Sequence, residues 1–318
     1  MPCTAERLRP LGSEGALGVI SPTYERPVTD MKQKLRPMEI LMNGVFFLCG
    51  FIAIVFVLFI SVYLVLSGLP AIREIGLREF LFGTRWASTA AEPAFGILPF
   101  ILTSVYGTAG AVVLGVPVGF LTAVFLAKVA PPRMAAAVRT AVDLLAGIPS
   151  VVYGLIGMMV LVPAVRTIFD LPDGASLFCA MVVLAVMILP SIISVSETAL
   201  KAVPREYEEA SLALGATEIE TYFRVSVPAA KSGIAASIVL GIGRAIGEAM
   251  AIIMVAGNVA NMPSLFSSVR FLTTAVASEM AYASGLQRQA LFSIALVLFL
   301  FIMAINIVLN TLLKRKKG

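Results

Sequence analysis

Two opposite charges stand inside a long apolar stretch of the chain. The run GIGRAIGEAM places Arg244 and Glu248 four residues apart, the spacing at which two side chains meet on one helix face. A charge near the bilayer centre costs about 2.5 to 3.5 kcal/mol, so such residues are by default candidates for a substrate path. A guanidinium offers paired, permanently charged donors that match an oxyanion. We therefore predict that Arg244 contacts a translocated oxyanion and that Glu248 is its counter-ion.

Small residues flank this charged pair. Gly243 and Gly247 leave room for a neighbouring helix or a pathway to come close, and both join the predicted translocation residues. Close helix packing without a pathway is an alternative explanation of the glycines. A purely structural ion pair is the alternative for the charges, although replacing a buried pair by apolar residues is often neutral or stabilising.

The elements that must position these residues are membrane helices. Of the 318 residues, 59% are hydrophobic and 14% are charged, and the mean hydropathy is +0.95. The apolar runs are continuous, whereas transmembrane strands would alternate with a period of two. We expect an all-α integral membrane protein with six transmembrane helices, at about residues 40–67, 97–127, 139–165, 175–197, 233–256 and 290–313.

The distribution of lysine and arginine predicts the orientation. Of the 24 such residues, 17 fall on the tail, loops and C-terminus expected inside, and six fall on the outer segments. The positive-inside rule therefore places both termini in the cytoplasm. The net charge of +5 reflects the same bias and does not indicate nucleic-acid binding. Residues 1–39, polar and rich in proline, are predicted to be a disordered cytoplasmic tail, and residues 40–318 the transmembrane domain.

Several chemistries are excluded by what the chain lacks. It contains no histidine, which removes histidine-dependent catalysis and histidine-ligated zinc. Lys231-Ser232 supplies the end of a phosphate-binding loop, but Ala230 stands where its second glycine is needed. The three cysteines form no CxxC pattern. We expect no enzyme activity, no metal site and no cofactor in this chain.

Residues 201–231 form the most structured polar segment, named here the 201–231 hairpin. Gly215 suits a left-handed helix cap, and Thr217 and Glu220 have the spacing of a capping box. Pro228 should stop or redirect the second helix before the fifth span. The segment is predicted to be two short helices in a rigid bent arrangement, and an ordinary surface connector is the alternative to a docking platform.

The same hairpin resembles the EAA loop of ABC-importer permeases. Glu209, Ala210, Gly215 and Pro228 stand at the family spacing, while Ser211 replaces the second alanine. In that family the loop sits in a groove of the cytoplasmic ATPase. The resemblance implies that these four matching residues couple the chain to such an ATPase.

Four further stretches resemble the phosphate-importer permeases of the PstC family. They are residues 96–127, 144–154, 240–258 and 271–286, although Ala249 replaces the usual threonine. The resemblance implies a type I, MetI-like permease in a bacterial inner membrane, with phosphate translocated past the arginine and glutamate of the GRAIGE motif. It also implies a PstA-like paralogous permease, two copies of a cytoplasmic ATPase that bind ATP and Mg, and an extracytoplasmic phosphate-binding protein as partners.

Alternatives to this function are a permease for molybdate or sulfate and, in another class, a passive anion channel. A channel would conduct without an ATPase and does not need the EAA loop. An intramembrane enzyme is hard to build without histidine.

Three other polar positions carry expectations. Asp143 follows Arg139 by one helical turn and is expected to pair with it near the inner surface. Glu279 is a candidate outer gate or part of the docking surface for a binding protein. Trp86 is expected to anchor the outer segment at the membrane interface.

Overall fold

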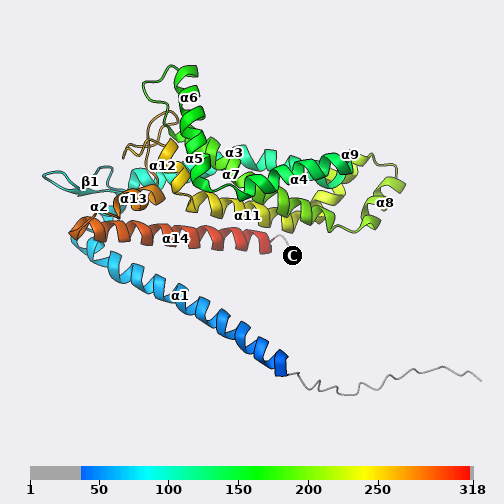
Figure 1. Ribbon diagram of the computed structural model, residues 1–318, viewed down its shortest axis with the longest axis horizontal. Coiled ribbons are helices and arrows are strands. Elements are labelled where there is room, and N and C mark those ends of the chain that lie inside the picture. The colour runs from blue at the N-terminus through cyan, green and yellow to red at the C-terminus, as the bar shows by residue number, and fades with distance from the viewer. Residues whose placement is uncertain (1–36, 316–318) are drawn as a thin grey trace, which may run out of the picture. The chain divides into compact units, whose positions relative to one another are not determined.

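A computed structural model describes residues 37–315 of the chain (Figure 1), which are almost entirely helical. The predicted tail, residues 1–39, lies outside the described residues except for its last three, which begin helix α1 (Pro37–Ile75). The chain divides into two units, residues 1–54 and residues 55–318. The described part of the first unit is one continuous helical segment of α1 whose apolar side chains are exposed.

The second unit contains the rest of α1 and all other elements. Three π-helical segments continue α3, α5 and α9: η1 (Phe125–Val129), η2 (Gly157–Leu161) and η3 (Tyr222–Ser226). Strands β1 (Trp86–Ala87) and β2 (Ala94–Phe95) pair antiparallel, with Trp86 opposite Phe95. The helices after α1 are α2 (Leu77–Phe82), α3 (Leu98–Val124), α4 (Pro132–Gly147), α5 (Ser150–Ile156), α6 (Val162–Ile168), α7 (Leu177–Lys201), α8 (Arg205–Ala213), α9 (Glu218–Thr221), α10 (Val227–Ala229), α11 (Lys231–Gly247), α12 (Met250–Val255), α13 (Leu272–Glu279) and α14 (Gly285–Arg315).

Helix α7 is the centre of this unit, and α3 and α11 both pack along it (Figure 1). Gly107, Ala111, Gly115 and Gly119 form a ridge of small residues at intervals of four along α3. A Cβ added at Gly115 would lie 2.9 Å from the Ile188 side chain of α7. Lipid is as apolar as leucine, so membrane helices associate through such close packing, and the ridge lets the α3 backbone approach α7.

The described residues contain five helices long and apolar enough to span a membrane, or six if the bent pair 218–229 and 231–247 counts as one span. This confirms the all-α membrane fold. The prediction of a single span over residues 139–165 is wrong, because the helix breaks between α4 and α5 and the span is Ser150–Ile168. Ile148 is extended, since the following Pro149 disfavours a helical conformation before it and offers no N–H.

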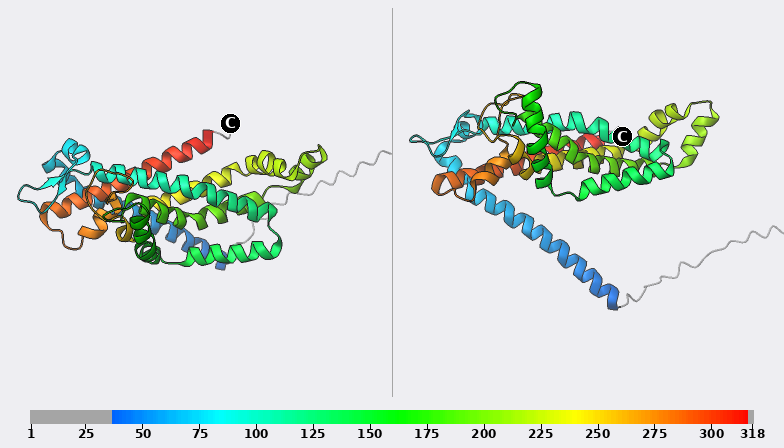
Figure 2. Two further views of the ribbon diagram at one scale, coloured as in Figure 1. Left: turned by 90° about the horizontal axis from the view of Figure 1, so that it is seen from above. Right: turned by 45° about the horizontal axis from the view of Figure 1, so that its top comes forward.

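The two hairpins of the second unit lie at opposite ends of its helices. Figure 2 shows α8 and α9 of the 201–231 hairpin at one end and the β1–β2 hairpin at the other, from two further directions. Helices α3, α7 and α11 run between these ends (Figure 1). The arrangement suits a protein that presents different surfaces on the two sides of a membrane.

Candidate functional site

The predicted fifth span, residues 233–256, is not one helix. Helix α11 ends at Gly247, Glu248 has an extended backbone with φ −74° and ψ 132°, and α12 starts at Met250. A break at membrane depth leaves backbone groups without helical partners, and these must be satisfied by the protein. Here the Ala251 amide donates to the Glu248 carboxylate at 3.0 Å, and the Thr273 hydroxyl donates to the Glu248 carbonyl at 2.7 Å.

This break changes the geometry expected of the charged pair. Arg244 and Glu248 do not form an ion pair, since the described chain contains no bridge between them within 4.0 Å. The intrahelical pairing predicted from their spacing is therefore wrong, because the helix ends before Glu248. Arg244 lies in the last turn of α11, where a cation interacts favourably with the helix C-terminus.

Tyr153 of α5 lies near Arg244. Its hydroxyl donates to the Leu145 carbonyl at 2.6 Å and so bridges the break between α4 and α5. Sequence reasoning missed Tyr153. Its position eight residues after Leu145 carries no local signal, and only the kink at Pro149 brings the two together.

The two broken spans cross beside these residues. A Cβ added at Gly154 of α5 would lie 2.8 Å from the Cα of Ala251 in α12, and one at Gly157 would lie 2.7 Å from the Val255 side chain. Gly154 therefore permits the backbones of α5 and α12 to approach closely. Pro149 is thus a bending position of this part of the chain, and Gly154 is a packing position.

The glycines beside the charges have a different environment. Added Cβ atoms at Gly243 and Gly247 would meet no atom within 4 Å, whereas one at Gly241 would lie 3.2 Å from Ile192 of α7. The α11 surface around Gly243 and Gly247 is therefore open within this chain. Arg244, half-buried, lies between these two positions in sequence.

The 201–231 hairpin has the predicted local structure. Gly215 has φ +86° and ends α8, and the capping box is complete, with the Glu220 amide 3.3 Å from the Thr217 hydroxyl and the Thr217 amide 3.1 Å from the Glu220 carboxylate. The carboxylate also accepts a hydrogen bond from the Thr217 hydroxyl at 3.2 Å, and the bonds from the Thr217 amide and hydroxyl lower the pKa of Glu220. The chain bends by 72° between Ala229 and Lys231, just after Pro228, as predicted.

One face of the hairpin is exposed and the other is anchored. Glu209 and Ala210 of α8 are exposed, and Leu214 and Ile219 are 90% and 69% exposed. Large apolar side chains this exposed are available for contact with a partner. This surface includes two of the four residues predicted to couple to a partner, Glu209 and Ala210.

The anchored face is held by Glu208, whose partners have no local signal in the sequence. Its carboxylate pairs with Lys128 of η1 and accepts a hydrogen bond from the Ser226 hydroxyl at 2.7 Å. The Tyr222 hydroxyl also donates to the Lys128 carbonyl at 3.3 Å. Partial burial raises the pKa of Glu208, but the bonds from Lys128 and Ser226 outweigh it, so the net pKa is lowered. The hairpin is thus tied to the end of α3 and η1.

Glu279 lies in a network at the opposite end of the unit. Its carboxylate pairs with Arg270, accepts from the Trp86 indole N–H at 3.3 Å, and accepts from the Gln287 amide at 3.0 Å. Trp86 is 9% exposed and packs edge-on against Phe95, so the expected interfacial anchor is instead a buried residue. The indole N–H is buried only because Glu279 accepts its hydrogen bond.

The described residues contain no group of three or more His, Cys, Asp or Glu side chains that could hold a metal ion. A cation–carboxylate cluster of Arg139, Glu197 and Lys201 does occur between α4 and α7. The expected pair of Arg139 with Asp143 is wrong, because the Arg139 Nε donates to Glu197 at 2.6 Å. Glu197 lies 58 residues from Arg139, and no local pattern connects them.

Helices long and apolar enough to span a membrane, together with the broken spans, indicate a multi-pass membrane protein. Residues 115–317 match the family described as binding-protein-dependent transport system inner membrane component. The chain belongs to this family. Its members are permease subunits of ABC transporters, so the chain is a transporter component and not an enzyme, as predicted.

Individual relatives extend the similarity over most of the chain. A probable ABC transporter permease, YqgH of Bacillus subtilis, is 38% identical over 81% of this chain and 86% of its own length. The phosphate transport system permease PstC of Pasteurella multocida is 34% identical, covering 76% and 82% of the two chains. PstC of Haemophilus influenzae is also 34% identical, covering 84% and 92%.

Solved structures support the fold. A chain of the MetNI methionine ABC transporter in an inward-facing conformation aligns with a TM-score of 0.51 and 20% identity, covering 69% of this chain and 94% of that one. A chain of a bacterial alginate ABC transporter, solved with its periplasmic protein, aligns with a TM-score of 0.56 and 15% identity, covering 86% and 94%. The MetI-like permease fold is therefore confirmed.

Proposed function

We propose that this chain is one membrane-spanning subunit of an ATP-driven importer of inorganic phosphate. Residues 40–318 form its permease domain in a bacterial-type inner membrane. Both termini lie on the cytoplasmic side of that membrane. The observation that carries the proposal is the similarity to PstC permeases of several bacteria, at 31 to 34% identity over 74 to 84% of this chain.

The chemistry of Arg244 supports an anionic substrate. The guanidinium has no ion-pair partner in the described chain, and it lies next to the open α11 surface of Gly243 and Gly247. Its paired donors match two oxygens of phosphate, and its charge is independent of physiological pH. Glu248 holds the break that ends α11 and places negative charge near the path, which keeps phosphate from being bound too tightly for release.

The 201–231 hairpin is the proposed contact with the ATPase. Glu209, Ala210, Gly215 and Pro228 match the family loop, and exposed Leu214 lies beside them. The complete importer contains this chain, a PstA-like paralogous permease, two copies of an ATPase that bind ATP and Mg, and an extracytoplasmic phosphate-binding protein.

Glu208 and Lys128 are the proposed mechanical connection between hairpin and spans. Closure of the ATPases moves the hairpin, and the Lys128–Glu208 pair transmits that movement to η1 and α3. Helix α3 packs along α7, which in turn packs along α11 and so reaches the Arg244 region. At the other end, Glu279 holds Trp86 and Arg270 together and so stabilises the outer segment as a gate or docking surface.

The test is ATP-dependent uptake of radiolabelled phosphate by proteoliposomes that contain the complete importer. Phosphate uptake is expected to require ATP and to persist in excess sulfate or molybdate. Strong inhibition of phosphate uptake by sulfate or molybdate would instead indicate that the inhibiting anion is the substrate. Uptake without ATP would favour a channel.

A further inference from the structure

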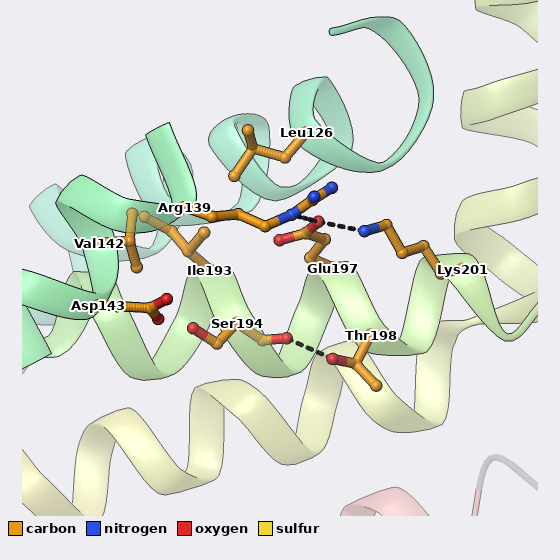
Figure 3. Close-up of a pocket in the computed structure, with 9 residues that line it drawn as sticks. All are labelled: Leu126, Arg139, Val142, Asp143, Ile193, Ser194, Glu197, Thr198 and Lys201. Atoms are coloured by element: carbon orange, nitrogen blue, oxygen red, sulfur yellow. Dashed lines mark hydrogen bonds and ion pairs between the residues drawn. The ribbon is translucent and has the colours of Figure 1, made fainter. Parts of the chain in front are cut away.

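A cavity of about 240 Å³ with charged groups in its lining lies between α4 and the last turns of α7, near the point where the 201–231 hairpin begins (Figure 3). It lies outside the Arg244 region and has no role in the function proposed above. Two cations, two carboxylates and two hydroxyl groups face it. The lining residues are Leu126, Arg139, Val142, Asp143, Ile193, Ser194, Glu197, Thr198 and Lys201.

Both cations converge on one buried carboxylate. The Nε of Arg139 and the Nζ of Lys201 each lie 2.6 Å from Oε1 of Glu197, which is 6% exposed. The two terminal nitrogens of the Arg139 guanidinium point away from Glu197 (Figure 3). Asp143, on the same helix as Arg139, forms no ion pair in the described part of the chain.

This arrangement prepares the arginine to bind an anion. A carboxylate that holds the guanidinium through Nε fixes the plane of the group and leaves the two terminal NH₂ groups as parallel donors. Lys201 supplies a second cation and retains donors beyond the one used on Glu197. Arg139, Lys201 and Glu197 together carry one net positive charge, and the Asp143 carboxylate on the same lining offsets it, so the favourable contact rests on the direction of the donors and not on net charge.

We propose that this cavity binds a phosphate group, with Arg139 and Lys201 as its ligands and Glu197 as the residue that positions both. Such a site would be a second binding site for the anion, separate from Arg244 and closer to the 201–231 hairpin. The assignment of phosphate as the bound anion rests on the proposed function. The same chemistry is offered by translocated inorganic phosphate and by the phosphate of a lipid headgroup, and the experiment separates the two.

Three substitutions distinguish an anion-binding site from a purely structural ion cluster by whether each raises or lowers the affinity for phosphate. Glu197→Gln keeps an acceptor oxygen for both cations but removes the negative charge that competes with an anion, so it should strengthen phosphate binding, whereas Arg139→Gln and Lys201→Gln should weaken it. A charged hydrogen bond contributes enough for a loss of at least about tenfold in affinity. In a purely structural cluster, all three substitutions lower thermal stability and none changes phosphate binding.

The experiment measures binding of radiolabelled inorganic phosphate to the purified permease–ATPase complex, without the binding protein and in an Arg244→Gln background that removes the other site. Arg133→Gln, at an exposed position of the same α4 helix, is the matched control and should bind like its parent. Opposite effects of Glu197→Gln and Arg139→Gln support the proposal. Unchanged phosphate binding in both, with no bound lipid, overturns it.

Native mass spectrometry of the same samples identifies the source of the phosphate group. A phospholipid retained by the parent and lost from Arg139→Gln, without binding of inorganic phosphate, assigns the site to a headgroup. ATP-dependent phosphate uptake by the otherwise unsubstituted importer is measured in parallel. Its absence defeats the proposed function, while normal uptake with an unresponsive cavity defeats only this inference.

Discussion

The 201–231 hairpin and the break in the fifth span are both bends in helical chain, but they are held in different ways. The hairpin bends at Gly215, Thr217 and Pro228, residues whose own backbone or side chain favours a turn or a cap. The break at Glu248 depends on Thr273, 25 residues away, and on the crossing of α5 and α12. Local chemistry forms the first bend, and tertiary contacts select the second.

The crossing of the broken spans should be sensitive to one added methyl group. Gly154→Ala places a Cβ against the Ala251 backbone, which cannot move as a side chain can. Overpacking of this kind costs about 1–3 kcal/mol. We expect a clear loss of thermal stability of the purified complex, measured by differential scanning fluorimetry.

The matched control for the crossing is Gly147→Ala. A Cβ at Gly147 meets no atom within 4 Å, so this variant should be as stable as the parent. Equal stability of the Gly154→Ala and Gly147→Ala variants would mean that the close approach of α5 and α12 is wrong.

The second prediction concerns the tie between the hairpin and α3. Lys128→Glu opposes Glu208 at a site where both side chains are mostly buried, and loss of a charged hydrogen bond there costs about 1.5–3 kcal/mol. Phosphate uptake per ATP hydrolysed should fall, because hairpin movement no longer reaches the spans. The double variant Lys128→Glu with Glu208→Lys should recover the ratio. An unchanged ratio of phosphate uptake to ATP hydrolysis in the Lys128→Glu variant would contradict the role of the Lys128–Glu208 pair in transmitting movement.

The same tie predicts a pH dependence. The pKa of Glu208 lies below its ordinary value of 4.5, so the stability it contributes is complete above that value and is lost as pH falls through the lowered pKa. Thermal stability of the Glu208→Gln variant and the parent should differ by a constant amount from pH 6 to pH 8. A difference that disappears within this range would contradict the assigned ionisation.

The third prediction addresses the break itself. Glu248→Ala removes the acceptor for the Ala251 amide, and loss of a helix cap costs about 1 kcal/mol. Glu248→Gln keeps a side-chain oxygen and should retain most of the stability. If both variants lose stability equally, the carboxylate charge matters more than the cap.

The smallest effect is expected in the hairpin. Thr217→Ala opens the capping box on an exposed helix, so the global melting temperature should barely change. Hydrogen exchange of residues 217–221 should become faster in this variant alone. Unchanged exchange would show that packing, and not the cap, holds α9.

The features that could be predicted from the sequence are those determined by residues close together in the chain. The helical membrane fold followed from continuous apolar runs, and the hairpin followed from Gly215, Thr217 and Pro228. Pro149 indicated a helix break, but the apolar run continues on both sides of it, so residues 139–165 were predicted as one span. The partners of Arg139 and Glu208 lie 58 and 80 residues away and could be found only in the fold.

The most direct test of the proposed function is phosphate uptake by the importer reconstituted with Arg244→Gln, compared with Arg244→Lys and the unsubstituted chain. We expect Arg244→Gln to assemble normally with the ATPase and to lose most ATP-dependent uptake, because the substitution removes the charged, paired donors proposed to contact phosphate. Arg244→Lys should retain part of it, since the charge remains while the paired donors are lost. Normal uptake by Arg244→Gln would contradict the assignment of this residue to the phosphate path.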